Sequence, residues 1–366
     1  MTPMDGRITH AHVERVAPGE LLVTWRGPTD VAVFVSDSPD DAGTFIVELA
    51  GPRMASVTGL AASERPYIHL LAPGGPFVVV AERQVPLAGT SNFRDIGGYP
   101  VASGGYVRWG SVFRSDHLAE LTADDLAVVT ALGVRTIIDL RGPHELAAQP
   151  SAVPADGSFT VVNLPIGDGS VDGVPLRELM EKGQLDQFSN DDMALLYETM
   201  LEEHADVFVA IVMAAAKADL GDNRGEEPTA GVAGSVFDGA LLYHCTAGKD
   251  RTGLATALLL STLGVDDATV LDDFELTNRY RSKWRVEELR PLLAEQGLDI
   301  DAFMPLFTAP RKALVAALAG LRERHGSVEA YLVAHGGMPT SVLDQLRARL
   351  IVGSAHDSAH DATAAP

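Results

Sequence analysis

One short segment constrains this chain more than any other, because it combines a strand, a small polar loop and an apolar helix. The strand is Leu241-Leu242-Tyr243-His244, the loop covers residues 245–253, and residues 254–263 continue as an apolar helix. Such a loop gathers backbone N–H groups at one point, and the dipole of the helix adds positive charge there. The segment therefore predicts an anion-binding site.

The loop begins with Cys245, which is the only cysteine of the chain. A single cysteine excludes an intramolecular disulfide and a multi-cysteine zinc cluster. The field at a helix N-terminus lowers a thiol pKa from ~8.5 to about 3.5–7.5, so we expect a thiolate at neutral pH. Arg251, six residues later, can fold back and hold two oxygens of a phosphate with its planar guanidinium. Together these residues predict a nucleophile and an anion clamp in one loop.

The run from His244 to Gly253, HCTAGKDRTG, resembles the phosphate-binding loop of the cysteine-dependent protein tyrosine phosphatase superfamily. Further matches to a bacterial group of these enzymes, some of which act on lipids, are NFRDIGGY at 92–99, FRS at 113–115, DLR at 139–141 and DFELTNRY at 273–280. The resemblance covers roughly residues 87 to 350. It implies hydrolysis of phosphate monoesters through a phosphocysteine, on phosphotyrosine, on phosphoserine or phosphothreonine, or on a phosphoinositide.

The resemblance also implies roles for the loop. Cys245 would be the nucleophile and Arg251 the clamp on the transition state. Substrate-binding positions would be Thr246, Ala247, Gly248, Lys249 and Thr252, with His244, Asp139 and Arg141 as supporting residues. Two of these assignments have alternatives: Thr252 either donates its hydroxyl to the thiolate or caps the helix, and Asp139 and Arg141 either brace the loop or form a structural salt bridge.

The general acid is open between two aspartates, because the chain has no Trp-Pro-Asp loop. Asp250 lies within the loop and resembles the loop aspartate of myotubularin-like lipid phosphatases. Asp168 follows a strand, at the place where dual-specificity phosphatases carry their acid, and can equally be an ordinary Asp-Gly turn. We favour Asp250, because proton donation requires reach more than a fixed sequence position.

Strands alternate with helical stretches after Pro86, which predicts an α/β domain over residues 87–353 with a central, mostly parallel sheet flanked by helices. Expected elements are strands at 107–113, 136–140, 160–164 and 241–244, and helices at 124–132 and 193–217. From residue 252 onward the chain should be helical, with breaks at Gly264, Gly297, Pro305, Gly326 and Gly336-Gly337. Residues 218–236 read as a Gly-rich surface loop.

Residues 1–86 carry short β-type runs separated by turns, which predicts a small β-sandwich-like domain whose architecture resembles a fibronectin type III module. Residues 354–366 are small and polar and read as a flexible tail. A basic run, Arg279, Arg281, Lys283 and Arg285, lies on a helix that covers the site in the family; we expect mainly a solvated face paired with Glu287 and Glu288.

The chain carries 28 Lys and Arg against 50 Asp and Glu, a net charge of −22 over 366 residues. This balance argues against nucleic-acid binding, so an anionic substrate must be captured by local charge. The sequence lacks a secretory signal and any apolar run of about 18 residues, so we expect a cytoplasmic protein without stable membrane insertion. No cofactor or metal is expected. The competing interpretation is a phosphate-binding pseudoenzyme or adaptor that uses the same loop.

Overall fold

The computed structural model describes residues 8–45, 53–61, 64–167, 180, 182, 185–217 and 239–353. Asp168, the expected loop at 218–236 and the expected tail at 354–366 lie outside these ranges. Among the described residues no single helix is both long and apolar enough to cross a membrane. The segments 300–307 and 311–325, bent by 52° between them, meet that test together on length and composition alone.

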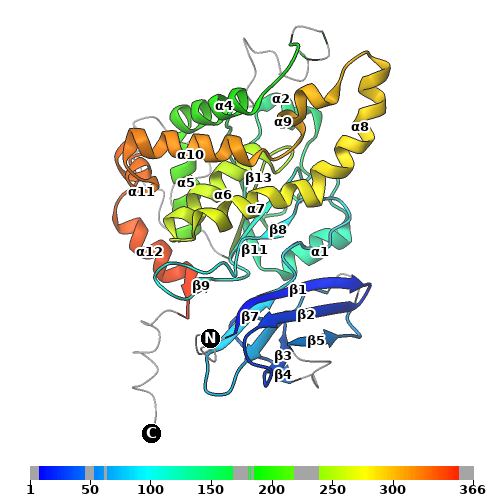
Figure 1. Cartoon of the computed structure of the whole chain (residues 1–366), viewed down its shortest axis with the longest axis vertical. Helices are drawn as coiled ribbons and strands as arrows, with labels where there is room; N and C mark the ends of the chain where they lie inside the picture. The colour runs from blue at the N-terminus through cyan, green and yellow to red at the C-terminus, as the bar shows by residue number, and fades with distance from the viewer. Residues whose placement is uncertain are drawn as a thin grey trace, which may run out of the picture.

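The N-terminal part consists of two antiparallel sheets (Figure 1). One sheet has the order β1 (Thr9–Ala17), β2 (Glu20–Arg26), β5 (Met54–Val57), and the other β4 (Thr44–Phe45), β3 (Ala32–Ser36), β6 (Tyr67–Leu71), β7 (Phe77–Ala81). Alternate residues of β2 are buried, as expected of a strand with one face on a core. Leu21 and Val23 of one sheet share a single hydrophobic cluster with Val33 and Ile68 of the other.

The larger part contains a five-stranded sheet with the order β12 (Thr160–Asn163), β11 (Val134–Asp139), β13 (Ala240–His244), β10 (Val112–Ser115), β8 (Arg94–Asp95). All neighbours are parallel except β8, which pairs antiparallel with β10. The prediction of a mostly parallel central sheet in an α/β domain is therefore confirmed. A small antiparallel pair joins β9 (Tyr106–Val107) to β14 (Ile351–Val352).

Helices flank this sheet (Figure 1). They are α1 (Ala123–Ala131), α2 (Pro143–Ala148), α4 (Asn190–Glu203), α5 (Ala205–Ala216), α6 (Asp250–Thr262), α7 (Asp267–Thr277), α8 (Lys283–Glu295), α9 (Met304–Phe307), α10 (Arg311–His325), α11 (Val328–Ala330) and α12 (Ser341–Leu350). Two π turns, η1 (Asn278–Ser282) and η3 (Tyr331–His335), and one 3-10 turn, η2 (Ile300–Phe303), complete the set. The expected glycine breaks fall just after α6, α8, α10 and η3.

Two helix predictions are wrong. The single helix expected over 193–217 is two helices, because His204 takes a non-helical backbone conformation between α4, which is buried on one face, and α5, which is almost fully buried. Pro305 does not break a helix but lies in the first turn of α9, where its missing N–H costs no hydrogen bond.

The two parts of the chain are joined by buried polar and aromatic contacts. Arg65 of the N-terminal part forms an ion pair of 3.1 Å with Asp95 on β8, and both side chains are almost fully buried. Tyr67 and Ala81 cluster with Trp109 of the larger part. Removal of either partner of an ion pair buried to this degree would leave an uncompensated buried charge and destabilise the fold.

Candidate active site

The loop after β13 lies at the carboxyl edge of the central sheet. His244 pairs in register with Ser115 of β10 and with Asp139 of β11, so the three strands end at one level. This is the edge at which open α/β sheets bind ligands. Cys245 follows directly, is 2% exposed and carries a free thiol.

The loop presents unpaired backbone donors. The N–H groups of residues 246–251 have no acceptor among the described residues, while the next donor that has one, Gly253, bonds the carbonyl of Lys249 at 2.8 Å. Helix α6 begins at Asp250, so its positive end points at the same loop. Unpaired amides at a helix N-terminus form a site for an anion.

Gly248 makes the loop's turn possible. Its φ is +62°, in the left-handed region, and a Cβ at this position would lie 2.5 Å from the carbonyl oxygen of Ser115. Only glycine combines this backbone conformation with so close an approach.

Arg251 is held by a carboxylate that our reading of the sequence missed. Its Nη1 and Nη2 lie 2.6 and 2.7 Å from the two oxygens of Glu145 on α2, and Nη1 also faces the carbonyl of Leu140 at 3.3 Å. Burial alone would raise the pKa of Glu145, but its hydrogen bonds from Arg251 and Thr246 outweigh it and lower the pKa to about 2. The remaining edge of the guanidinium, with Nε, has no partner among the described residues and is available to an anion.

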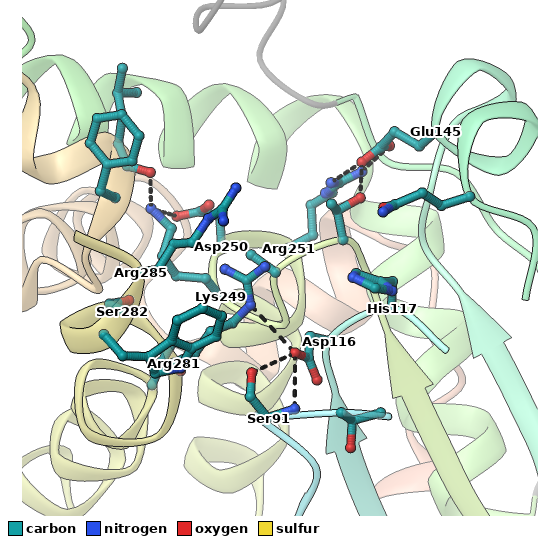
Figure 2. Close-up of a pocket in the computed structure, with 18 of the residues that line it drawn as sticks. Ser91, Asp116, His117, Glu145, Lys249, Asp250, Arg251, Arg281, Ser282 and Arg285 are labelled. Carbon is teal, nitrogen blue, oxygen red and sulfur yellow. Dashed lines mark hydrogen bonds and ion pairs between the residues drawn. The ribbon is translucent and has the colours of Figure 1, made fainter. Parts of the chain in front are cut away.

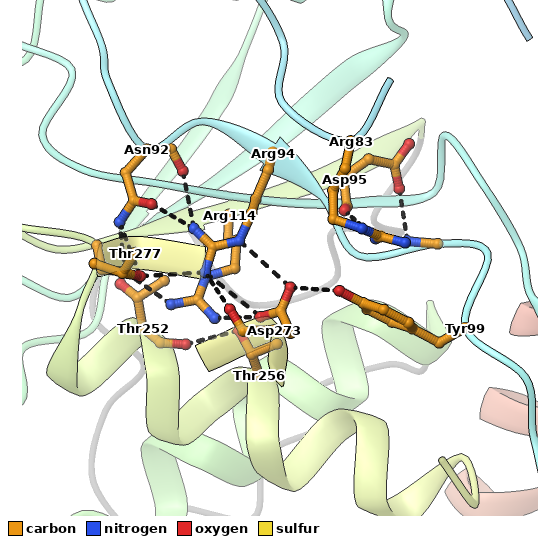
Figure 3. Close-up of polar contacts among 12 residues, drawn as sticks. Arg83, Asn92, Arg94, Asp95, Tyr99, Arg114, Thr252, Thr256, Asp273 and Thr277 are labelled. Atoms are coloured by element: carbon orange, nitrogen blue, oxygen red, sulfur yellow. Dashed lines mark hydrogen bonds and ion pairs between the residues drawn. The ribbon is translucent and has the colours of Figure 1, made fainter. Parts of the chain in front are cut away.

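The back of the loop is held by side chains of the NFRD and FRS segments (Figure 3). Asn92 donates from Nδ2 to the carbonyls of Ala247 and Gly248, both at 3.0 Å. Arg114 donates from Nη2 to the Gly248 carbonyl at 2.8 Å. Because these carbonyls are bonded from behind, the N–H groups of the loop are turned toward the front.

Two arginines share one carboxylate beneath the loop. Arg94, Arg114 and Asp273 are fully buried; Arg114 Nη1 lies 2.8 Å from Asp273 Oδ2, and Arg94 Nε 3.4 Å from Oδ1. Burial alone would raise the pKa of Asp273, but the two arginines lower it to about 2. Burial, together with Arg94, lowers the pKa of Arg114 to about 10. Two cations against one carboxylate leave a net positive charge behind the anion site.

His244, Asp139 and Arg141 form a second buried group. Arg141 pairs with Asp139 at 2.8 Å and donates to the carbonyl of Gln149, at the C-terminal end of α2, the helix that carries Glu145. Asp139 also faces His244 Nε2 at 3.4 Å. Burial lowers the pKa of His244 to about 4 despite this carboxylate, so His244 is neutral at neutral pH. Of the two suggested roles, the contacts fit the structural salt bridge, because neither Asp139 nor Arg141 forms a hydrogen bond with residues 245–253 among the described residues.

The side chains of Lys249 and Asp250, in the second half of the loop, point toward helices α9 and α4. Lys249 directs Nζ at the carbonyls of Pro305 and Leu306, at 3.1 and 2.9 Å, and lies 3.3 Å from Asp250 Oδ1. Tyr197 of α4 donates to the same Oδ1 at 2.6 Å. Lys249 therefore ties the loop to α9, and the Asp250 carboxylate is fixed from two sides.

Thr246 and Thr252 differ in their contacts. The Thr246 hydroxyl donates to Glu145. Thr252 is the third residue of α6, whose N-cap is Lys249, so it does not cap the helix. Its buried hydroxyl has no hydrogen-bond partner among the described residues, so the expected bond to the Cys245 sulfur is not formed in this structure either.

A pocket of about 760 Å³ opens above the loop (Figure 2). Thr246, Ala247, Lys249, Asp250 and Arg251 line its base, and Glu145, Asp116 and His117 one side. Apolar walls come from three helices: Met193, Leu196 and Met200 of α4, Trp284 and Leu289 of α8, and Leu306 and Phe307 of α9.

The basic run is divided between the pocket and the surface. Arg281, in the π turn η1, lines the pocket and lies 3.4 Å from Asp116, while Arg285 pairs with Glu288 at 2.7 Å and also lines the pocket. Arg279 instead lies 3.5 Å from Glu14 of the N-terminal part. The expectation of a solvated face paired with Glu287 and Glu288 therefore holds in part. Arg279 and Lys283 are exposed and Arg285 pairs with Glu288, but Arg281 and Arg285 also line the pocket.

Two residues of the site came from no motif that we singled out. Glu145 follows Arg141 by four residues, and its only signal was an acidic side chain in the first turn of a helix that begins with proline. Tyr197 had no signal, because α4 reaches the loop only through the packing of the helices.

Comparison with known proteins agrees with this site. The model of the tyrosine phosphatase family matches residues 85–352. A putative tyrosine-protein phosphatase of Cupriavidus necator is 30% identical over 270 residues, covering 72% of this chain and 89% of that protein. The triple specificity protein phosphatase PtpB of Mycobacterium tuberculosis is 25% identical over 299 residues, covering 74% and 100%. A tyrosine-protein phosphatase of Nostoc commune is 27% identical over 243 residues, covering 65% and 73%.

The family match spans the central sheet, the loop after β13 and the helices around the pocket. The chain accordingly belongs to the tyrosine phosphatase family and is a phosphoric monoester hydrolase.

Proposed function

We propose that this phosphatase removes phosphate from phosphotyrosine in proteins through a phosphocysteine intermediate. One observation carries the proposal: a free thiol begins a loop whose N–H groups, from 246 to 251, have no acceptor among the described residues, and Arg251 keeps one edge for an anion. An arrangement of this kind stabilises the charge that develops on phosphoryl oxygens.

In the first step the sulfur of Cys245 attacks phosphorus, an S–P bond forms and the ester P–O bond breaks. The leaving oxygen takes a proton from the general acid, for which we propose Asp250. Its Oδ1 is held by Tyr197 and Lys249, and Oδ2 has no partner among the described residues. In the second step water attacks phosphorus, its proton passes to the carboxylate, and the S–P bond breaks to release phosphate and the thiolate.

The walls of the pocket favour an aromatic phosphoester. Met193, Leu196 and Trp284 offer apolar surface above the loop. Arg281 and Arg285, which pair with Asp116 and Glu288, also line the pocket. An aryl ring can be buried against these apolar side chains, while acidic residues that flank it in a peptide can contact the two arginines. Phosphoserine, phosphothreonine and phosphoinositides are the alternative substrates, because the loop itself recognises only the phosphate.

We further propose that residues 1–86 form a separate β-sandwich-like domain, residues 87–353 the catalytic domain and residues 354–366 a tail. The proposal for the first domain is supported by the hydrophobic cluster that the two N-terminal sheets share. The start of the family match at residue 85 supports the boundary.

The test is hydrolysis of a phosphotyrosine peptide, the matching phosphoserine peptide and a panel of phosphoinositides, by the wild type and by Cys245→Ser. We expect the highest kcat/KM on phosphotyrosine and no turnover by the variant, which should still bind inorganic phosphate. Near-normal turnover by the variant would refute Cys245 as the nucleophile. A wild type that binds phosphate without any turnover would instead support the pseudoenzyme.

Asp250→Asn and Asp168→Asn separate the two candidate acids. An alkyl alcohol must be protonated as it leaves, whereas an activated phenol needs little help, so loss of the true acid reduces rates on alkyl phosphates most. We expect this pattern for Asp250→Asn, and rates near wild type for Asp168→Asn. The reverse pattern would assign the acid to Asp168, and a uniform loss for Asp250→Asn would assign it a role in positioning.

A further inference from the structure

Three side chains with metal-binding atoms meet on the helical layer, outside the phosphate pocket. Glu202 lies in the last turn of α4, His325 is the last residue of α10, and His335 is the last residue of η3. α4 and α10 lie side by side (Figure 1), and η3, in the segment after α10, packs against α10 and α5. None of the three side chains lines the pocket above Cys245.

Both imidazoles present the same ring nitrogen to one carboxylate. His325 Nε2 lies 3.1 Å from Glu202 Oε1, and His335 Nε2 lies 3.4 Å from Oε2. One ligand atom from each residue can be chosen so that all three lie within 4.8 Å of one another. Four ligands at about 2.0–2.1 Å from a tetrahedral zinc ion are roughly 3.3–3.4 Å apart. Each imidazole therefore lies at about this spacing from one of the two carboxylate oxygens, and a shift of the three ligand atoms from within 4.8 Å to about 3.4 Å would complete the zinc geometry.

The two rings are held in place before any ion binds. The ring of Tyr331 packs against both, with centroids 5.3 Å from His325 and 5.6 Å from His335. Tyr331 is fully buried and donates its hydroxyl to the carbonyl of Leu201 at 2.5 Å, next to Glu202 in the sequence. A preorganised set of ligands loses less conformational freedom on binding.

One cation already competes for the carboxylate. Arg324 Nε lies 2.8 Å from Glu202 Oε1, but its Nη1 also lies 2.9 Å from Glu198 Oε2. Arg324 can therefore keep Glu198 as a partner if Glu202 binds a metal ion.

We propose that Glu202, His325 and His335 form a binding site for one zinc ion, with the fourth coordination position left to water. Two imidazoles and a carboxylate are ligands that zinc prefers, and three protein ligands leave a tetrahedral ion one open position. The ion would join α4, α10 and η3, and α4 is the helix whose Tyr197 holds Asp250. The site thus stabilises the layer that supports the loop.

The test is calorimetric titration of Zn²⁺ into the full chain carrying Cys245→Ser, which removes the only thiol as a competing ligand. We expect one ion per chain and, after substitution of Co²⁺, the absorption bands of a tetrahedral site. His335→Ala and His335→Gln in this background should weaken binding by at least about 100-fold, since even loss of an outer-shell partner costs about 10- to 100-fold. Arg324→Gln should tighten it, because the competing cation is removed.

The matched control is His117→Ala, which removes a histidine that lines the phosphate pocket and should leave zinc binding unchanged. Circular dichroism verifies that each variant is folded. Absence of stoichiometric binding, equal binding by a folded His335 variant, or loss of binding in His117→Ala would each overturn the site. Unchanged or weaker binding by Arg324→Gln would contradict Glu202 as a ligand.

Discussion

Replacing Glu145 with glutamine tests whether this carboxylate orients Arg251, the proposed clamp on phosphate. The carboxylate accepts from both Nη atoms of Arg251, whereas an amide offers one oxygen and one NH₂ group, so one of the two contacts becomes donor against donor. The guanidinium must then rotate, and its phosphate-facing edge moves with it.

The size of the effect follows from the charge on Glu145. A pKa held at about 2 instead of 4.5 corresponds to about 3 kcal/mol in favour of the ionised form, at about 1.4 kcal/mol per tenfold. This figure is an upper bound, because the side chain is 19% exposed. Removing one partner of a buried pair costs about 3–5 kcal/mol, and the partial exposure reduces this here to about 2–3 kcal/mol. A misplacement of the clamp by about 1 Å reduces turnover by roughly 100-fold.

We therefore expect Glu145→Gln to lower kcat on 4-nitrophenyl phosphate by about 100-fold. Inhibition by inorganic phosphate should change little, because loss of a negative charge beside the site offsets the poorer geometry. Steady-state kinetics measure the loss of turnover and the inhibition by phosphate, and denaturation in urea measures the loss of stability. Glu120→Gln is the control, since Glu120 lines the same pocket but forms no hydrogen bond or ion pair with Arg251. A kcat within threefold of wild type would refute the positioning role.

Three further predictions concern stability. Gly248→Ala should destabilise by at least about 1–3 kcal/mol in urea denaturation, because its Cβ would lie 2.5 Å from a carbonyl oxygen; a tolerated alanine would mean that the loop can shift. His244 has a pKa of about 4 when folded, below its ordinary 6.5, so it takes up a proton on unfolding. Between these two pKa values the unfolded state binds more protons, so the free energy of unfolding falls by about 3 kcal/mol as the pH falls from 6.5 to 4 and does not change through this group above pH 6.5. Stability measured across pH should be flatter in this window for His244→Gln, and an equal slope would exclude this histidine as the cause. Removing residues 1–84 should lower Tm by calorimetry, because Asp95 loses the partner of its buried ion pair; an unchanged Tm would show that the pair adds no net stability.

The architecture of the catalytic part could be read from local patterns. Strand and helix periodicities predicted the mostly parallel sheet, which the structure confirms, and the segment around Cys245 predicted a loop between a strand and a helix N-terminus. The loop has this arrangement because a strand that ends at a loop of small residues, followed by a helix, has few ways to arrange its backbone. The helix predicted over 193–217 failed, because the turn at His204 depends on which face of each helix is buried.

The sequence by itself determined where the loop between a strand and a helix lies and which thiol begins it, since both follow from residues that are neighbours in the chain. Only the tertiary structure decided how that loop is held. Glu145, Asn92, Arg114 and Tyr197 reach it from four separate segments, and Asp273 holds Arg114 from a fifth. Lys249, which the sequence placed with the substrate, points at the carbonyls of α9. The physical reason is that a buried charge or polar group needs partners, and these come from whichever segments the packing brings close to it. The spacing of residues along the chain does not predict which segments those are.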